Sequence, residues 1–271
     1  MASKVFVVTG VSSGIGKVLI SKILENISTD DIMVGLGRSN ISNFKDNRFV
    51  FIKTDLSKPD NIKNSIKVIK KSFGHVDVLV NNAGFAYRAT IEDLSLDEVR
   101  EQFEVNLFGP LELTKSVLPL MRERGGHIVN IGSVGSIVST PTLGYYAATK
   151  ASLDKISDVL DQEVSGFNIK VSTLIPGAVQ TEFGKNIRLP KNYSKSQYRS
   201  LYEAWQSRFA YFFKQRNTPE ETAQAVWSLI EKPIRIKYLS LRDYFMCQLK
   251  RLLPYSVFQS LFLNYYYKYE S

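Results

Sequence analysis

Short apolar runs alternate with longer segments of helical periodicity along most of the chain. The apolar runs are strand candidates over residues 5–8, 32–36, 49–52, 76–80, 127–131 and 169–174, with a seventh expected within 234–241. The helical segments cover residues 14–25, 59–73, 96–124 and 145–165. Continuous apolar strands separated by helices indicate a parallel sheet covered on both faces. The pattern predicts a single doubly wound α/β domain, with about seven strands, over residues 1–271.

The last third of the chain departs from this rhythm. Residues 184–217 show no strand pattern and are rich in Lys, Arg, Tyr and Phe. A helix is expected from Thr218 to Pro233, because an N-cap residue, a proline and two acids open it. Two further helical pieces, about 242–253 and 255–268, form a basic, aromatic C-terminal extension over 242–271. The second piece has an apolar stripe along one helix face, and this stripe must pack against another surface.

The net charge of +9 lies entirely in this last third, because residues 185–271 hold 15 Lys/Arg and 6 Asp/Glu. A basic, aromatic end could face a membrane, an anionic substrate or nucleic acid, or could simply keep the surface soluble. We favour packing of the 255–268 stripe on the protein body, with peripheral membrane contact as an added role. No nucleic-acid partner is expected, because the sequence holds no recognised binding module.

Other classes of site and location are excluded by composition. The single cysteine, Cys247, rules out an internal disulfide framework. The chain has two histidines and no metal-ligand motif, so we expect no metal site. Residues 4–9 already read as a strand, so no targeting signal is expected, and no run reaches the length of a membrane span. The expected location is cytoplasmic, with membrane association as the alternative.

A glycine-rich turn follows the first predicted strand. Its sequence, Thr9-Gly10-Val11-Ser12-Ser13-Gly14-Ile15-Gly16, has the spacing T-G-x-x-x-G-x-G and leads into the first predicted helix. Such a turn lets backbone N–H groups approach a pyrophosphate at the positive end of a helix.

The second motif pairs a tyrosine with a lysine. Tyr146 and Lys150 are four residues apart and share one helix face, and Ser133 lies thirteen residues before Tyr146. An ammonium beside a phenol is expected to lower the tyrosine pKa towards neutrality, which would let Tyr146 exchange a proton. Further along the chain stand Asn81-Asn82-Ala83-Gly84, Asn106 and Pro176-Gly177. Together these motifs resemble the short-chain dehydrogenase/reductase family over about residues 4–183.

The resemblance implies a Rossmann-type fold and a reversible hydride transfer between nicotinamide and a carbonyl or carbinol carbon. It assigns the proton transfer to Tyr146, the polarising hydrogen bond to Ser133 and a water-holding role to Asn106. Lys150 would lower the tyrosine pKa and contact the nicotinamide ribose. A serine hydrolase is a poor alternative, because no nucleophile elbow surrounds Ser133.

The resemblance also implies the cofactor contacts. The expected set is Gly10, Ser12, Ser13, Gly14, Ile15, Gly16, Arg38, Ser39, Asp55, Leu56, Asn82, Ala83, Gly84, Tyr146, Lys150, Pro176, Gly177, Val179 and Thr181. Gly37 occupies the position where an acid would select NAD, and Arg38 follows it, so NADP(H) is favoured with NAD(H) as the alternative. Ser13 stands where a basic residue would strengthen that preference.

The predicted activity is that of an NADP(H)-preferring alcohol dehydrogenase or carbonyl reductase. Residues 184–217 would form the variable substrate lid, whose aromatic residues suggest a bulky apolar substrate such as a lipid, steroid, retinoid or aromatic ketone. These residues are Tyr193, Tyr198, Tyr202, Trp205, Phe209, Tyr211, Phe212 and Phe213. A homodimer or homotetramer is expected through the helices at 96–124 and 145–165. The alternative of another class is a nucleotide-sensing or membrane-docked scaffold without turnover.

Overall fold

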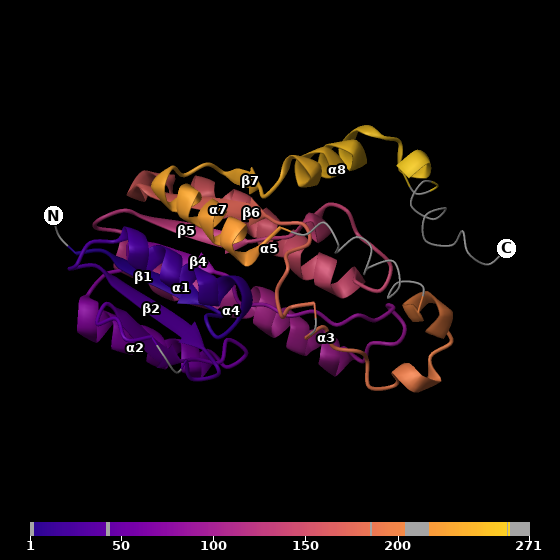
Figure 1. The fold of residues 1–271 in the computed structure, drawn as a ribbon, viewed down its shortest axis with the longest axis horizontal. Helices are drawn as coiled ribbons and strands as arrows, with labels where there is room; N and C mark the ends of the chain where they lie inside the picture. Colours follow the sequence, from indigo (N-terminus) through magenta and orange to yellow (C-terminus); the bar gives the residue numbers. More distant parts are fainter. Residues whose placement is uncertain (1–2, 42–43, 185, 204–216, 259, 261–271) are drawn as a thin grey trace.

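A parallel sheet of seven strands forms the centre of the molecule (Figure 1). The computed structural model describes residues 3–41, 44–184, 186–203, 217–258 and 260. The strands are β1 (Val5–Thr9), β2 (Ile32–Gly37), β3 (Phe49–Lys53), β4 (Val78–Asn81), β5 (Gly126–Ile131), β6 (Ile169–Ile175) and β7 (Ile236–Tyr238). Their order across the sheet is β3-β2-β1-β4-β5-β6-β7. The predicted doubly wound α/β fold is confirmed.

Helices cover both faces of this sheet (Figure 1). One face packs against α1 (Gly14–Asn26) and α7 (Pro219–Glu231), and the other against α2 (Pro59–Phe73), α4 (Gly109–Met121) and α5 (Gly144–Glu163). Side chains alternate along each strand, so β1 sends Phe6 and Val8 into one core and Val5 and Val7 into the other. This double burial explains why the strands are predominantly apolar.

The chain leaves β1 in one direction to form β2, and β4 lies on the other side of β1. Such a reversal opens a crevice at the carboxyl ends of the strands, where open α/β sheets bind ligands. The loops after β1, β2, β4, β5 and β6 therefore meet at this edge, and they carry the motifs found in the sequence.

The helix predicted over residues 96–124 is divided into three parts. α3 (Leu96–Phe103) and α4 are joined by a π-helical turn, η1 (Glu104–Phe108), in which the Gly109 N–H donates to the Glu104 carbonyl. Pro110 has no N–H to donate to the Asn106 carbonyl, so regular α-helical bonding cannot continue there. The prediction of a single helix was therefore wrong. The π-helical turn contains Asn106, and such turns are frequent at functional sites.

The structure also describes three short 3₁₀-helical turns: η2 (Val134–Ser136), η3 (Ser165–Phe167) and η4 (Tyr193–Lys195), the last of them in the lid. α7 begins at the predicted place, with a capping box between Thr218 and Glu221. α8 (Leu241–Leu252) follows β7 and confirms the first helix of the extension. Most of the predicted helix at 255–268 lies outside the described residues. Within the described part, none of the helices has the length and apolarity needed to cross a bilayer.

Candidate active site

The turn between β1 and α1 has backbone conformations that favour glycine. Gly10 has φ +72° and Gly14 has φ +54°. At Gly16 any side chain would overlap the Gly10 carbonyl oxygen. The Ser13 side chain makes no cap hydrogen bond, and the first turn of α1 has no acidic residue. The positive end of α1 therefore suits an anion such as the pyrophosphate of a dinucleotide.

Asn82 ties the end of β4 to this glycine turn. Its side-chain amide donates to the carbonyl oxygens of Thr9, at 2.9 Å, and Gly10, at 3.3 Å. The Thr9 hydroxyl accepts from the backbone N–H groups of Asn82 and Ala83, both at 3.0 Å. A β-carbon on Gly84 would press against the side chains behind it. These residues hold the shape of the crevice.

The far end of the pocket lies after β2 and β3. Arg38 and Ser39 are exposed there, and Asp55 lines the same wall. The Asp55 carboxylate accepts hydrogen bonds from the backbone N–H and hydroxyl of Ser57, at 2.9 and 2.8 Å, which shapes the turn. An exposed guanidinium after β2 can form charge-assisted hydrogen bonds to a phosphate.

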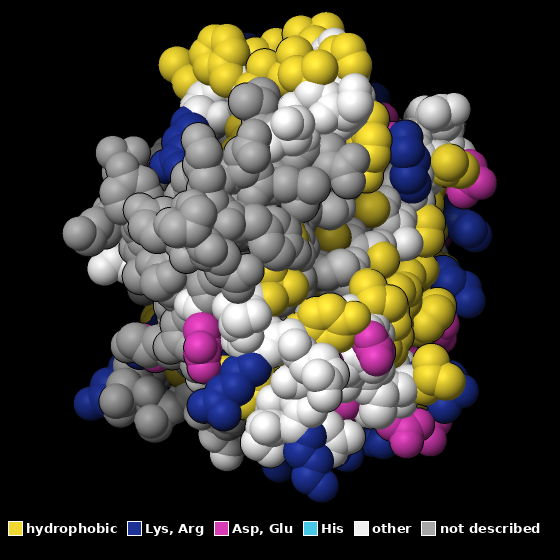
Figure 2. All heavy atoms as spheres, turned by 90° about the vertical axis from the view of Figure 1, so that its right-hand side faces the viewer, with side chains coloured by type: hydrophobic (Ala, Val, Ile, Leu, Met, Phe, Trp, Pro, Cys, Tyr) yellow, Lys and Arg dark blue, Asp and Glu magenta, His cyan; other side chains and the backbone are white. Residues whose placement is uncertain are grey.

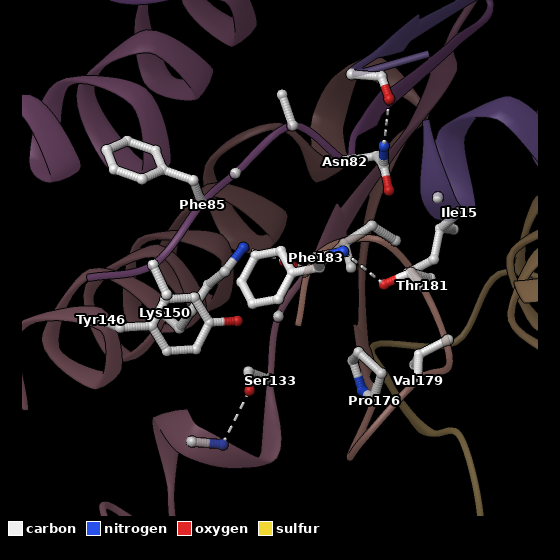
Figure 3. Close-up of a pocket in the computed structure, with 18 of the residues that line it drawn as sticks. Ile15, Asn82, Phe85, Ser133, Tyr146, Lys150, Pro176, Val179, Thr181 and Phe183 are labelled. Carbon is white, nitrogen blue, oxygen red and sulfur yellow. Dashed lines mark hydrogen bonds between the residues drawn. The ribbon is translucent and has the colours of Figure 1, made fainter. Parts of the chain in front are cut away.

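Ser133, Tyr146 and Lys150 converge on one wall of the pocket (Figure 3). Ser133 follows β5, whereas Tyr146 and Lys150 lie one turn apart in α5. The Gly135 N–H donates to the Ser133 hydroxyl oxygen at 3.0 Å, which orients that hydroxyl. The buried Lys150 ammonium donates to the Ile131 carbonyl oxygen at 2.7 Å. The structure thus brings together the three side chains that the motif spacing singled out.

The electrostatics of this group differ from the expectation. Burial raises the pKa of the Tyr146 phenol, and its hydrogen bond with Ser133 only opposes that shift. Burial also lowers the pKa of Lys150 to about 8. The expected lowering of the Tyr146 pKa by Lys150 is therefore not found, because burial is the largest cause of the shift and it raises the pKa. At neutral pH the phenol stays protonated, which is the form that can donate a proton to a carbonyl oxygen.

Asn106 clamps the chain after β4 onto α5. Its side-chain oxygen accepts from the Phe85 N–H at 3.0 Å, and its amide donates to the Phe85 carbonyl at 2.8 Å and the Thr149 hydroxyl at 3.3 Å. The side chain is fully buried. The geometry shows how Asn106 positions Phe85, which lines the pocket. The water-holding role stays a prediction.

The loop after β6 forms the opposite wall with Pro176, Gly177, Val179 and Thr181. Sequence reasoning missed its partner, Asp243 of α8, whose side chain is only 5% exposed and which accepts a hydrogen bond from the Gly177 N–H at 3.1 Å. The sequence held one signal for this residue. Asp243 is the single acidic residue in the stretch 232–260, which also contains six Lys and Arg residues.

Phe183, which stands at the start of the predicted lid region, was not named as a site residue. Its ring packs against the Tyr146 ring, with centroids 5.8 Å apart and planes tilted by 54° (Figure 3). Its N–H donates to the Thr181 hydroxyl at 3.2 Å. An aromatic ring therefore stands directly beside the candidate proton donor.

Arg188 joins the lid to the body of the protein. Its guanidinium lies over the Phe85 ring, 4.4 Å from the centroid, and donates to the Glu101 carboxylate at 2.7 Å. This contact was not anticipated from the sequence.

Within the described part of the lid, Tyr193, Tyr198 and Tyr202 pack the lid rather than line the pocket. The Tyr202 side chain is fully buried, and its hydroxyl accepts from the Thr90 N–H and donates to Asp93, at 2.9 and 2.8 Å. Tyr193 stacks edge-on against Tyr202, and the Tyr198 hydroxyl donates to Glu92. The other aromatic residues named for the lid, Trp205, Phe209, Tyr211, Phe212 and Phe213, lie outside the described residues.

All of these walls enclose one pocket of about 1,090 Å³. Of the residues expected to be catalytic or to bind the cofactor, those that line it are Gly10, Ser12, Ser13, Gly14, Ile15, Arg38, Ser39, Asp55, Leu56, Asn82, Ala83, Gly84, Ser133, Tyr146, Lys150, Pro176, Gly177, Val179 and Thr181. Gly16 and Asn106 are not among the lining residues. The side chains that make its walls apolar include Phe85, Val105, Val138, Leu143, Phe183, Ile187 and Met246. The described residues include no cluster of acids, histidines and cysteine that could hold a metal.

Comparisons with known proteins agree with this geometry. A family model described as short chain dehydrogenase matches residues 4–192. A mouse protein named dehydrogenase/reductase SDR family member 7B is 36% identical over 197 residues, which cover 69% of this chain and 61% of that protein. A 3-ketodihydrosphingosine reductase from Bacteroides thetaiotaomicron is 33% identical over 187 residues, covering 69% of this chain and 68% of that protein.

Among solved structures, a short-chain dehydrogenase from Streptomyces avermitilis superposes with a TM-score of 0.79 and 29% identity, covering 96% of this chain and 95% of that one. The family match, the relatives and the shared fold extend over the crevice and its motifs. The chain therefore belongs to the short-chain dehydrogenase/reductase family of NAD(P)-dependent oxidoreductases.

Proposed function

We propose that this protein is an NADP(H)-preferring reductase of ketones that carry bulky apolar groups, with NAD(H) as the secondary cofactor. The observation that carries the proposal is the convergence of Ser133, Tyr146 and Lys150 in a pocket that has Arg38 at its other end. The uncapped start of α1 between these two ends suits the pyrophosphate. A nicotinamide dinucleotide, when bound, supplies or accepts the hydride.

Three residues of the pocket would carry out the proton transfer and stabilise the developing charge. Tyr146, which burial keeps protonated, gives its proton to the carbonyl oxygen during reduction and removes one during oxidation. The Ser133 oxygen accepts from Gly135, and its O–H would donate to the substrate oxygen, where it stabilises developing negative charge. Lys150, with a pKa of about 8, can restore the proton of Tyr146 near neutral pH.

The walls around Tyr146 favour an apolar substrate. Phe85, Leu143, Phe183 and Met246 all line the pocket. The Bacteroides relative is named for a keto sphingoid base, which is a lipid. We therefore place this chain's substrate among lipid-like or aromatic ketones.

Exposed apolar side chains support the proposal of a homodimer or homotetramer. Phe108 of η1 and Ile156 and Val159 of α5 are 51%, 38% and 54% exposed, and η1 packs against α5. Exposed apolar side chains on adjacent helices suit a homomeric interface.

Exchange of Arg38 tests the cofactor assignment. Arg38→Asp replaces charge-assisted hydrogen bonds to the 2′-phosphate, worth about 1.5–3 kcal/mol each, by repulsion. We expect the ratio of kcat/KM for NADPH over NADH to fall about a hundredfold or more. Lys71→Asp, an exposed charge reversal on α2, is the matched control.

The assay follows cofactor absorbance with a panel of lipid-like and aromatic ketones. A wild-type enzyme that uses NADH more efficiently than NADPH contradicts the NADP assignment. Saturable NADPH binding without turnover of any ketone or alcohol would instead favour the nucleotide-sensing alternative.

A further inference from the structure

α8 presents an apolar face to solvent. Leu241, Phe245, Leu249 and Leu252 are 76%, 64%, 48% and 81% exposed. At 3.6 residues per turn these four positions fall on one side of the helix. Figure 2 shows hydrophobic side chains gathered at the top of the molecule, where Figure 1 places α8. A contiguous exposed apolar face of this kind marks an interaction surface.

The opposite side of α8 is already anchored to the protein. Cys247 is fully buried and packs with Val134, Val138 and Ile175, and Asp243 accepts the hydrogen bond from Gly177. The helix is therefore fixed with its outer face turned away from the core.

Two of the three basic residues of α8 border this outer face. Arg242 and Arg251 are exposed, and their helical positions lie on the two edges of the apolar side. Asp243, the helix's single acid, is buried on the inner side. Apolar side chains bordered by arginines are the pattern of helices that lie in the surface of an anionic membrane.

We propose that α8 docks this protein on the surface of an anionic lipid bilayer. Leu241, Phe245, Leu249 and Leu252 enter the boundary between headgroups and acyl chains, and the arginines meet lipid phosphates. A second copy is a poorer occupant, because the surface would meet its own positive edges across a two-fold axis. The surface differs from the 255–268 stripe suggested by the sequence.

Docking through α8 also places the pocket near the bilayer. Ser240, Arg242 and Met246, from the start of α8 and the residue before it, line the pocket. An apolar ketone could then pass between the lipid phase and the active site. This last step rests on the proposed function, whereas docking itself does not.

Vesicle sedimentation without cofactor or substrate tests the docking. Wild-type protein is mixed with phosphatidylcholine vesicles that contain no anionic lipid or about 30% phosphatidylserine. The test variant is Phe245→Glu/Leu249→Glu, which puts two acids on the outer face. The control is Val68→Glu/Leu96→Glu, the same kind of change at exposed apolar sites of α2 and α3.

We expect wild type and control to bind the anionic vesicles, and the α8 variant to bind at least about tenfold more weakly. Binding should also weaken with added salt. Arg251→Gln should weaken binding by about fivefold, which corresponds to about 1 kcal/mol for the loss of one cation. Turnover of a water-soluble ketone is measured in parallel, so that loss of docking and failure of the proposed activity are separated.

Three results would overturn the proposal. The first is wild-type protein that does not sediment with anionic vesicles. The second is equal binding by wild type and the α8 variant. The third is a light-scattering mass showing that the α8 variant dissociates a wild-type oligomer, which would assign the surface to a second copy.

Discussion

The contact between Asp243 and Gly177 predicts that the C-terminal helix stabilises the cofactor loop. Asp243→Ala removes the carboxylate that accepts from the Gly177 N–H at 3.1 Å. It also removes the acid from the first turn of α8, where Ser240 is the N-cap. Asp243→Asn keeps an oxygen acceptor and removes only the charge.

The magnitude follows from these two contacts. A hydrogen bond to a charged group contributes about 1.5–3 kcal/mol, and an acid in the first turn of a helix about 0.3–1 kcal/mol. Asp243→Ala should therefore lower the free energy of unfolding by about 2–4 kcal/mol and the Tm by about 4–8 °C. Asp243→Asn should lower the free energy of unfolding by about 1 kcal/mol. Because Gly177 leads into the loop carrying Val179 and Thr181, KM for the cofactor should rise in the alanine variant.

Thermal unfolding and fluorescence titration with NADPH measure both effects. Asp97→Ala, in the first turn of α3, is the control, because its side chain is 87% exposed. A β-carbon on Gly177 would overlap the Asp243 carboxylate, so Gly177→Ala should be less damaging when combined with Asp243→Ala. An Asp243→Ala protein with wild-type Tm and cofactor affinity would refute the reasoning.

Two further perturbations test buried polar side chains of the protein. Asn106→Ala leaves the backbone N–H and carbonyl of Phe85 without their hydrogen-bond partner. We expect the free energy of unfolding, measured with denaturant, to fall by about 2–4 kcal/mol. We also expect the KM for ketone, measured by steady-state kinetics, to rise. His127 is buried with its pKa lowered to about 4, so the unfolded chain takes up its proton first as pH falls. As the pH falls from about 6.5 to about 4, the free energy of unfolding should therefore decrease more in wild type than in His127→Gln. The difference should be on the order of 3 kcal/mol, and urea unfolding at a series of pH values measures it. Equal stability in Asn106→Ala, or equal pH slopes for the two proteins, would contradict these predictions.

The sequence was most informative where local pattern and tertiary environment agree. The first six strands lie within two residues of their predicted ends, because buried parallel strands need continuous apolar runs. The sequence also placed Ser133 at the carboxyl end of β5 and Tyr146 and Lys150 in the next helix, so all three were expected near the edge where open α/β sheets bind ligands.

What failed depended on three-dimensional context. A π-helical turn and an α-helix share nearly the same apolar periodicity, so η1 was read as part of one long helix. The raised pKa of Tyr146 reflects burial, which the spacing to Lys150 does not report. Phe183 and Asp243 come from segments outside the motifs and reach the pocket only through tertiary packing.

The central claim is that Tyr146 transfers the proton that accompanies hydride transfer. Tyr146→Phe removes the transferable proton and keeps the ring that packs against Phe183. Tyr145→Phe is the matched control, because it removes the neighbouring hydroxyl, which donates to the Ile91 carbonyl at 3.2 Å.

The most direct measurement is kcat for ketone reduction by both variants, after each has been shown to be folded and to bind NADPH as wild type does. The account predicts that Tyr146→Phe loses at least about a hundredfold in kcat and that Tyr145→Phe stays within about threefold of wild type. A folded, NADPH-binding Tyr146→Phe enzyme with near-wild-type kcat would contradict the assignment.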